Sequence, residues 1–177
     1  MKRTSIILAC DIEGGIGYKN GIPWNIPQEM HKFRKITTEV SDQSKKNAVI
    51  MGKNTWLSLR RKPLKNRINI VITKSEEYEK DDCLIVSSIA EALEYGEKIN
   101  NIEKIFIIGG SSVYNECLYK YNFDIILSML YYDEYKTDSF VDIEYLFKKY
   151  NLEKDKIYKE QHENRLFASY ICTHKRT

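Results

Sequence analysis

Seven short apolar runs, separated by stretches with helical patterns, constrain the fold of this sequence more than any other feature. They are residues 5–10, 48–51, 68–73, 84–86, 105–108, 125–130 and 166–172. The runs are continuous and β-branched rather than alternating, which is typical of strands covered on both faces. Strands that alternate with helices predict an α/β fold, with a central, mostly parallel sheet flanked by helices.

Local signals predict three further features. Ser88 and Glu91 form a capping box, in which the serine hydroxyl accepts a backbone N–H and the glutamate reaches back, and a helix should follow to about residue 99. Pro27 suits the first turn of another helix, because its missing N–H has no intrahelical partner there. The last strands are separated by a charged turn around residues 160–164, which predicts a hairpin that closes the sheet at an antiparallel edge.

Length and charge exclude several classes of protein. A chain of 177 residues fits one domain, residues 1–177. The net charge is only +3, with Lys and Arg scattered among Asp and Glu, so no basic face indicates a nucleic-acid partner. The first apolar run is too short for a signal peptide, and no window approaches a membrane span. We therefore expect a cytoplasmic protein.

The cysteines indicate neither a metal site nor a disulfide framework. Cys10, Cys83, Cys117 and Cys172 lie far apart, with no CxxC pair. In a reducing compartment such residues behave as small buried hydrophobes. We expect no metal and no cysteine chemistry.

One strand-to-helix turn has the composition of a phosphate site. Ligands of open α/β sheets gather beyond the carboxyl ends of the strands. Gly109 and Gly110 follow one strand and precede a helix that opens with two serines. Glycines let a backbone approach a phosphate, and the free N–H groups of a helix start favour an anion. The alternative is plain turn geometry, because the fingerprint GxGxxG is absent.

Two more turns add cations and hydroxyls. Residues 51–56 contain a glycine, a lysine and Thr55, whose hydroxyl could cap the helix or donate to a phosphate. Residues 71–75 end with two hydroxyls around Lys74, which would suit the extra phosphate of a 2′-phosphorylated adenosine. A solvated lysine is the simpler alternative. Three such turns in one small domain favour a phosphorylated dinucleotide.

Glu29 lies just behind Trp24 and Pro27, where the chain has the composition of a buried segment. Desolvation disfavours the ionised form of a buried carboxylate, which therefore titrates upward or acquires a partner. A ligand with adjacent ring N–H and amino donors could be that partner, through two parallel hydrogen bonds. The alternative is that Glu29 only favours the positive end of its helix in water. Apolar walls for a flat heterocycle would come from Ile22, Trp24, Met30 and Phe33.

Four motif blocks, in this order and spacing, resemble the dihydrofolate reductase family. They are the segment with Ile16-Gly17, Gly21-Ile22-Pro23-Trp24, Pro27, Glu29 and Phe33, then VIMGKNTW, RKPLKNRINIVITKS and IFIIGGSSVY. The match covers nearly the whole chain, including residues 125–130 and the terminal hairpin. The resemblance implies a single dihydrofolate reductase-like α/β domain that reduces 7,8-dihydrofolate to 5,6,7,8-tetrahydrofolate, in support of one-carbon metabolism and thymidylate synthesis.

The resemblance also implies roles for individual residues on the substrate side. Glu29 matches the acidic residue that binds N3 and the 2-amino group of the pterin. Ser128 stands where relatives usually carry threonine, whose hydroxyl supports the acid, and Trp24 matches a residue that reaches the ligand through water. Arg67 matches the arginine that pairs with the α-carboxylate of the substrate, a bidentate task to which lysine is poorly suited. Further implied substrate contacts are Ile7, Ala9, Ile22, Met30, Phe33, Leu59, Leu64, Ile108 and Tyr114.

The implied cofactor is NADPH. The family's Gly-Gly bond in the turn after residue 108 is cis, and residues 11–22 match the mobile loop that closes over the nicotinamide, with glycines able to accommodate hinge motion. Asn66 replaces a glycine common at its turn, and asparagine tolerates the left-handed conformation. The implied cofactor contacts are Ala9, Ile16, Gly17, Gly21, Gly52, Lys53, Asn54, Thr55, Thr73, Lys74, Ser75, Ile108, Gly109, Gly110, Ser111, Ser112, Val113 and Tyr114.

The implied reaction moves a hydride to C6 of the substrate while a proton reaches N5 through water. Glu29 would orient and polarise the ring. A pyrimidine reductase of the riboflavin pathway and a non-catalytic folate-binding protein are the alternatives. We expect a monomer that binds antifolate inhibitors and needs neither nucleic acid nor membrane. The chain has no room for the fused thymidylate synthase of some relatives, and a complex with a separate synthase stays open.

Overall fold

The computed structural model describes residues 1–75, 82–131, 135–159 and 166–175. The strands are β1 (Arg3–Asp11), β2 (Gly15–Gly17), β3 (Lys46–Gly52), β4 (Arg67–Ile72), β5 (Leu84–Val86), β6 (Ile102–Ile107), β7 (Asp124–Leu130), β8 (Ser139–Phe140), β9 (Tyr150–Lys159) and β10 (Leu166–His174). The helices are α1 (Pro27–Thr38), α2 (Lys53–Ser58), α3 (Ile89–Lys98), α4 (Ser111–Lys120) and α5 (Ile143–Lys149). All seven predicted runs are strands.

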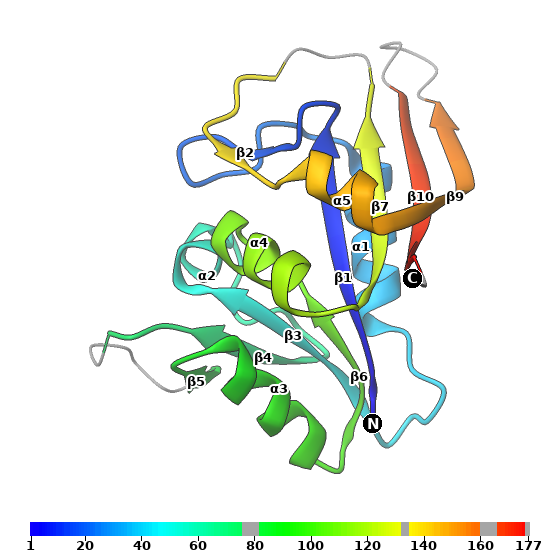
Figure 1. Ribbon diagram of the computed structural model, residues 1–177. Helices are drawn as coiled ribbons and strands as arrows, with labels where there is room; N and C mark the ends of the chain where they lie inside the picture. The colour runs from blue at the N-terminus through cyan, green and yellow to red at the C-terminus, as the bar shows by residue number, and fades with distance from the viewer. Residues whose placement is uncertain (76–81, 132–134, 160–165, 176–177) are drawn as a thin grey trace.

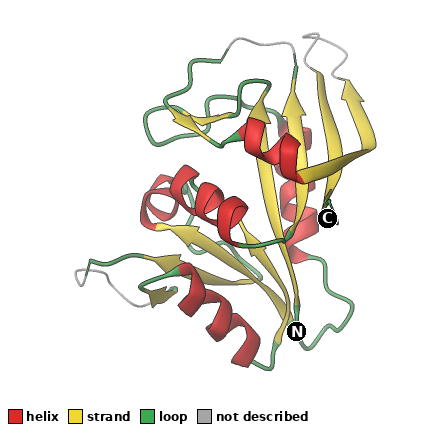
Figure 2. Ribbon diagram, in the orientation of Figure 1, coloured by secondary structure: helices red, strands yellow, loops and turns green. Residues whose placement is uncertain are grey.

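An eight-stranded sheet in the order β5-β4-β3-β6-β1-β7-β10-β9 forms the centre of the molecule (Figure 1, Figure 2). The first six strands of this order pair in parallel, whereas β10 is antiparallel to both β7 and β9. The predicted α/β fold, with its antiparallel C-terminal hairpin, is therefore confirmed. The charged turn of that hairpin lies outside the described residues.

Strand β1 explains why the apolar runs are continuous. Ile6 and Leu8 belong to the largest core cluster, which includes residues of α3, α4 and α5. Ile7 belongs to a second cluster, which includes Trp56 of α2 and Phe33 of α1. Successive side chains of a strand point to opposite faces, so helices must cover both. Figure 1 shows α3, α4 and α5 in front of the sheet and α1 behind it.

The local predictions are largely confirmed. Pro27 opens α1, and Ser88 Oγ accepts a hydrogen bond from the backbone N–H of Glu91 at 3.1 Å. The Glu91 carboxylate accepts from the backbone N–H and the hydroxyl of Ser87 rather than from the backbone N–H of Ser88. The returning hydrogen bond of the predicted capping box is therefore shifted by one residue. Helix α3 ends at Lys98, as predicted.

The remaining features concern the cysteines and the membrane prediction. Cys10, Cys117 and Cys172 are buried free thiols, whereas Cys83 is only half-buried, which corrects the prediction of burial for that residue. Within the described ranges, no helix is long and apolar enough to cross a membrane.

A second sheet, formed by β2 and β8, was not foreseen. Its strands are three and two residues long, and β2 has the sequence GIG, so neither forms an apolar run. In this pairing Gly15 lies opposite Phe140, so the loop after β1 is joined to a segment more than a hundred residues away along the chain. Tertiary contact rather than local preference therefore makes these strands.

Candidate active site

The three predicted phosphate-binding turns meet at one edge of the sheet. Strand β3 pairs with both β4 and β6 in parallel, so their carboxyl ends lie together. Thr73 follows β4, Gly52 joins β3 to α2, and a glycine pair joins β6 to α4. The backbone N–H of Gly52 donates to the carbonyl of Gly109 at 2.8 Å, which ties two of the turns directly.

The glycine turn after β6 has little space for side chains. The Gly109-Gly110 bond is cis, as the resemblance implied, and Gly109 has φ +106°. A Cβ on Gly109 would lie 2.8 Å from the ring of Tyr114, and one on Gly110 would lie 3.2 Å from Thr55 Oγ1. No side chain caps α4, whose N-cap is Gly110. Its first N–H groups therefore suit an anion.

Thr55 is not the cap of α2. Gly52 is the N-cap, without a side-chain hydrogen bond, and Thr55 is the third residue of the helix. The capping alternative is therefore wrong, and the hydroxyl instead faces the glycine turn. In the third turn, Thr73 Oγ1 accepts from the backbone N–H of Ser75 at 3.1 Å, and Lys74 is exposed.

The other predicted cofactor residues surround these turns. Lys53 and Ser111 are half-buried, Asn54 and Ser112 are exposed, and Val113 is buried. Ile16 packs against the largest core cluster, and Ala9 against the cluster that contains Trp24. The structure thus brings the turns after β3, β4 and β6 to one edge, whereas Ala9 lies in β1 and Ile16 in β2.

Glu29 is buried, with 7% of its surface exposed. It lies in the first turn of α1, and its backbone N–H donates to Ile26 O at 3.1 Å. Burial raises the pKa of its carboxyl group, and the nearby Lys32 ammonium partly opposes this. The alternative of a carboxylate in water at the helix start is therefore wrong. Burial and, to a smaller extent, the charge of Glu29 raise the pKa of Tyr114.

Tyr114 joins the glycine turn to strand β1. Its ring lies against the space above Gly109, and its hydroxyl donates to the carbonyl of Ile7 in β1 at 2.8 Å. Burial is the main reason that the pKa of this phenol is raised well above its ordinary value. Tyr114 is therefore a neutral donor that joins α4 to β1.

Most predicted ring contacts gather in one apolar cluster. Ile22 and Met30 depart from it, because 59% and 49% of their surfaces are exposed and they form no buried wall in the protein alone. Trp24 packs with Ile26 in another cluster, and its indole Nε1 is buried without an acceptor among the described residues. The predicted residues in the shared cluster are Ile7, Phe33, Leu59, Leu64 and Ile108.

Arg67 is held by two hydrogen bonds. Its Nη1 donates to Thr37 Oγ1 at 2.9 Å and its Nε to Lys65 O at 3.0 Å. Burial, with a contribution from Arg34, lowers its pKa. Asn66 has φ 61°, so the predicted left-handed turn is confirmed. Thr37 and Arg34 carry no motif of their own, and only their spacing on α1, three residues apart, places them near one another.

Ser128 does not support Glu29 directly. Its hydroxyl accepts a hydrogen bond from Lys32 Nζ at 3.1 Å, and no bond between Ser128 and Glu29 is found in the described part of the chain. Instead of contacting Glu29 directly, Ser128 bonds Lys32, whose ammonium acts on Glu29 electrostatically. Sequence reasoning missed this lysine, although it lies three residues after Glu29 and so on the same helix face.

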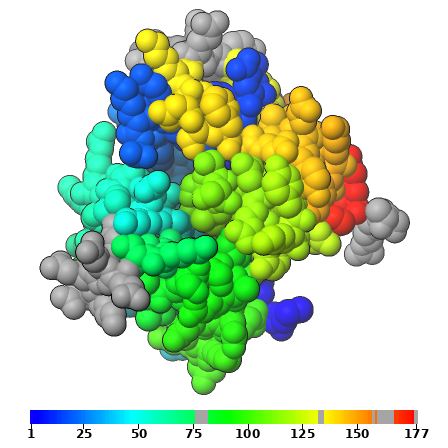
Figure 3. All heavy atoms as spheres, turned by 60° about the vertical axis from the view of Figure 1, so that its left-hand side comes forward, coloured from blue at the N-terminus to red at the C-terminus, as the bar shows by residue number. Residues whose placement is uncertain are grey.

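The loop of residues 11–22 is fastened at several points. Asp11 Oδ1 accepts from the backbone N–H groups of Gly15 at 2.7 Å and Glu13 at 2.9 Å. Gly14 has φ +85°, and a Cβ on Gly15 would lie 2.4 Å from Asp11 Oδ2, so both glycines have a local reason. Figure 3 shows the blue loop beside the yellow segment that contains β8. Hinge motion stays a prediction.

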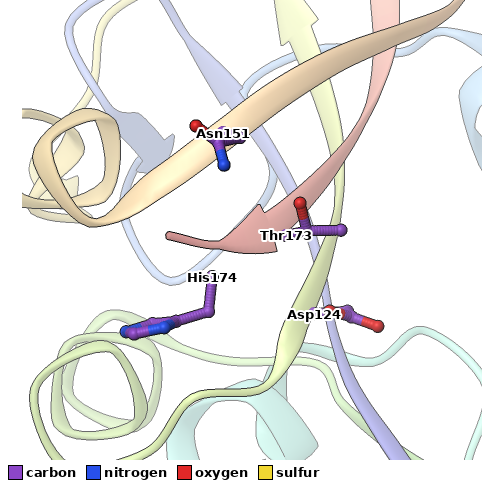
Figure 4. A pocket seen from close by; sticks show the side chains of 4 residues that line it. All are labelled: Asp124, Asn151, Thr173 and His174. Carbon is purple, nitrogen blue, oxygen red and sulfur yellow. The ribbon is translucent and has the colours of Figure 1, made fainter. Parts of the chain in front are cut away.

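A separate pocket lies at the other end of the sheet. Figure 4 shows its lining residues, Asp124, Asn151, Thr173 and His174, around the first residue of β7 and the last residues of β10. The predicted site lies at the carboxyl ends of the parallel strands, and none of these four residues belongs to it. This pocket therefore takes no part in the candidate site.

Comparisons with known proteins agree with this geometry. A family model described as dihydrofolate reductase matches residues 3–175. Dihydrofolate reductases of Aedes albopictus, Saccharomyces cerevisiae and Candida albicans are 35%, 41% and 39% identical over 125, 121 and 108 residues. These alignments cover 67%, 62% and 59% of this chain and 67%, 57% and 55% of the relatives, so the chain spans about two thirds or less of the relatives it matches. Because the family model matches nearly its whole length, this chain belongs to the dihydrofolate reductase family.

Proposed function

We propose that this protein reduces 7,8-dihydrofolate to 5,6,7,8-tetrahydrofolate with NADPH. The observation that carries the proposal is the Glu29 carboxylate, which is 7% exposed and acts electrostatically on Tyr114, whose ring lies against Gly109. A carboxylate at this place can accept two parallel hydrogen bonds from a ring N–H and an adjacent amino group. Such hydrogen bonds from a ligand compensate the desolvation of the carboxylate, so the burial of this acid is consistent with a ligand-binding role.

Family membership implies a nicotinamide cofactor, and the residues at the sheet edge fit one. The uncapped start of α4 suits a pyrophosphate, and a Cβ at Gly110 would close the space next to Thr55 Oγ1. We expect Lys74, with the hydroxyls of Thr73 and Ser75, to bind a 2′-phosphate, which favours NADPH over NADH. When bound, the cofactor supplies the hydride that C6 of the substrate accepts.

The protein's own residues bind and orient the substrate. Glu29 accepts from N3 and the 2-amino group, which places the acid away from N5. Proton delivery to N5 therefore goes through a water molecule, and the buried indole N–H of Trp24, which lacks a protein acceptor in the described chain, is suited to hold it. Arg67, oriented by Thr37, binds the α-carboxylate of the substrate tail.

Enclosure is the second contribution of the protein. Phe33, Leu59 and Ile108 belong to the cluster that would border the ring and exclude water from it. Holding two reactants in a reactive orientation can contribute about 7–11 kcal/mol in well-oriented systems. The same proposal includes a monomeric, cytoplasmic enzyme that binds antifolates through Glu29.

The test is NADPH oxidation that depends on dihydrofolate, followed by the loss of nicotinamide absorbance. We expect turnover with dihydrofolate and none with an aminopyrimidine of the riboflavin pathway. Turnover of the pyrimidine would instead support the alternative reductase. Calorimetric binding of dihydrofolate without any NADPH oxidation would support the non-catalytic alternative and overturn the proposal.

A further inference from the structure

Lys32 is a charged side chain drawn into the protein beside the candidate site. It lies on α1, three residues after Glu29, and is half-buried, whereas its neighbours His31 and Lys35 are exposed. Its Nζ donates hydrogen bonds to Ser128 Oγ at 3.1 Å and to Ser169 Oγ. A lysine ammonium is rarely taken from water without such compensation.

The two hydroxyls form a matched receptor for the ammonium. Ser128 of β7 and Ser169 of β10 are directly opposite each other in the antiparallel register, so their side chains share one face of the sheet. Both are buried, with 3% and 0% of their surfaces exposed. Because an ammonium is a donor only, both serine oxygens must accept from it, and their own protons point elsewhere. Lys32 is thus fixed at a defined place between α1 and the sheet.

The titratable groups identified around Glu29 and Lys32 come from three elements, α1, α4 and β9. Glu29 interacts with Lys32 on its own helix, and Tyr114 approaches Glu29 from α4. Asp155 approaches Lys32 from β9. Lys32 also lines an open groove of about 700 Å³ between α1 and β9, together with His31, Lys35, Glu39 and Asp155. Of the groups that act on Glu29, Lys32 is therefore the only cation identified in the described chain.

We propose that Lys32 is a positioning residue for Glu29, and that its ammonium, held by the paired hydroxyls of Ser128 and Ser169, keeps the acid ionised for ligand binding. This inference rests on the proposed function, because it concerns the same acid. Burial disfavours the carboxylate, and the cation opposes that effect, so the two groups act as a couple. The pKa of Lys32 is itself lowered by desolvation, and the negative charges of Glu29 and Asp155 oppose this.

The test measures binding of trimethoprim, a 2,4-diaminopyrimidine, as a function of pH. Protonation of Glu29 should weaken binding at low pH, so the midpoint of that limb reports its pKa. An opposite charge lowers the pKa of a carboxyl group, so removal of the Lys32 ammonium takes away the effect that opposes burial of Glu29. We therefore expect Lys32→Met to move the midpoint to higher pH. The inhibitor itself also titrates, but it does so equally with all variants, so differences in the midpoint between variants report on the protein.

Matched variants separate charge from structure. Lys32→Gln keeps a polar group without the charge and should move the midpoint as Lys32→Met does, whereas Lys32→Arg should restore it toward the wild-type value. Lys35→Met removes the same charge one turn away on an exposed side chain and should leave the midpoint unchanged. Equal weakening at every pH, with an unchanged midpoint, would assign Lys32 a merely structural role and overturn the inference.

A second measurement is independent of any ligand. The carboxyl ¹³C resonance of Glu29, assigned by its loss in Glu29→Gln, gives the pKa in the free protein. Lys32→Met and Lys32→Gln should raise this pKa, and an unchanged value would overturn the inference. Failure of the wild-type protein to oxidise NADPH with dihydrofolate would instead count against the proposed function while leaving this titration interpretable.

Discussion

The two sides of the site are built from different chemical groups. On the side of α1, we propose that side-chain charges bind the substrate: Glu29 is buried and influenced by the charge of Lys32, and Arg67 donates to Thr37. On the side of β3 and β6, we propose that backbone groups and hydroxyls bind the cofactor, beside a turn where a Cβ on Gly109 or Gly110 would lie 2.8 or 3.2 Å from a neighbouring atom. One side is sensitive to charge, and the other is sensitive to volume.

This difference predicts different effects on stability. Burial disfavours the ionised form of Glu29, so its charge lowers the free energy of unfolding. The glycine turn carries no such electrostatic cost, but Gly109 adopts a backbone conformation that other residues rarely tolerate. A substitution on the acid side should therefore reduce function without reducing stability, whereas one in the turn should reduce both.

Glu29→Gln should have the largest effect. Two charge-assisted hydrogen bonds, at about 1.5–3 kcal/mol each, are weakened or lost, so kcat/KM for dihydrofolate at neutral pH should fall by roughly 10²–10⁴-fold. The free energy of unfolding should stay the same or rise, because the amide removes a buried charge. Steady-state kinetics and urea denaturation measure the two quantities, and near-wild-type turnover would contradict the role of the acid.

The pH dependence of stability tests the same residue. The folded pKa of Glu29 is raised above its ordinary value of 4.5, so the native state holds more protons than the unfolded state in the window above 4.5. The stability contribution is therefore fully present below that window and is lost as pH rises through the folded pKa. Glu29→Gln should abolish this part of the slope, measured by denaturation across the window.

Gly109→Ala should have the next largest effect and a different signature. At φ +106°, with a Cβ 2.8 Å from the Tyr114 ring, alanine should cost about 1–3 kcal/mol of stability. Displacement of Tyr114 would also weaken its bond to Ile7 O, and KM for NADPH should rise roughly tenfold. Denaturation and initial-rate kinetics measure this, and a stable variant with only dihydrofolate binding impaired would break the comparison between the two sides.

The fold and the backbone side were predictable because their signals are local. Continuous apolar runs predicted the strands of the main sheet, since a doubly covered strand needs apolar residues at successive positions. The glycine turn was predictable because glycine is the residue that most readily adopts a positive φ, so a glycine pair after a strand indicates a turn. By contrast, β2 and β8 exist only through pairing across more than a hundred residues, and their sequences carry no strand pattern.

The charged side was only half predictable. The position of Glu29 among apolar and proline residues indicated burial, but the sequence did not show which group would stand beside it. In the sequence, Lys32 looks like an ordinary solvated helix lysine. Only the structure shows that β7 and β10 place two serines opposite each other, where both accept hydrogen bonds from it. Thr37 likewise acquires its role only when Arg67 is brought to it from the start of β4. Side chains that depend on such long-range contacts require the structure.

Thr37→Val should produce a smaller effect that sharpens the assignment on the charged side. The change removes the acceptor of Arg67 Nη1, which should raise KM for dihydrofolate about fivefold, corresponding to about 1 kcal/mol, with kcat little changed. Thr38→Val is the matched control, because Thr38 Oγ1 only returns to the backbone of α1. Equal KM values for the two variants would remove Thr37 from the substrate side.

Substitution of Asn66 should give the smallest effect, and it tests whether backbone geometry also matters on the charged side. Asn66 adopts φ 61° directly before Arg67, so Asn66→Ala should cost about 1 kcal/mol of stability, because its Cβ is disfavoured in the left-handed region. Asn66→Gly should stay within about 0.5 kcal/mol of wild type, because glycine adopts this conformation freely but loses more entropy on folding. Thermal unfolding and KM for dihydrofolate measure both. If Asn66→Ala raised KM tenfold without loss of stability, the turn would orient Arg67 as much as Thr37 does, and the charged side would depend on its backbone as the glycine side does.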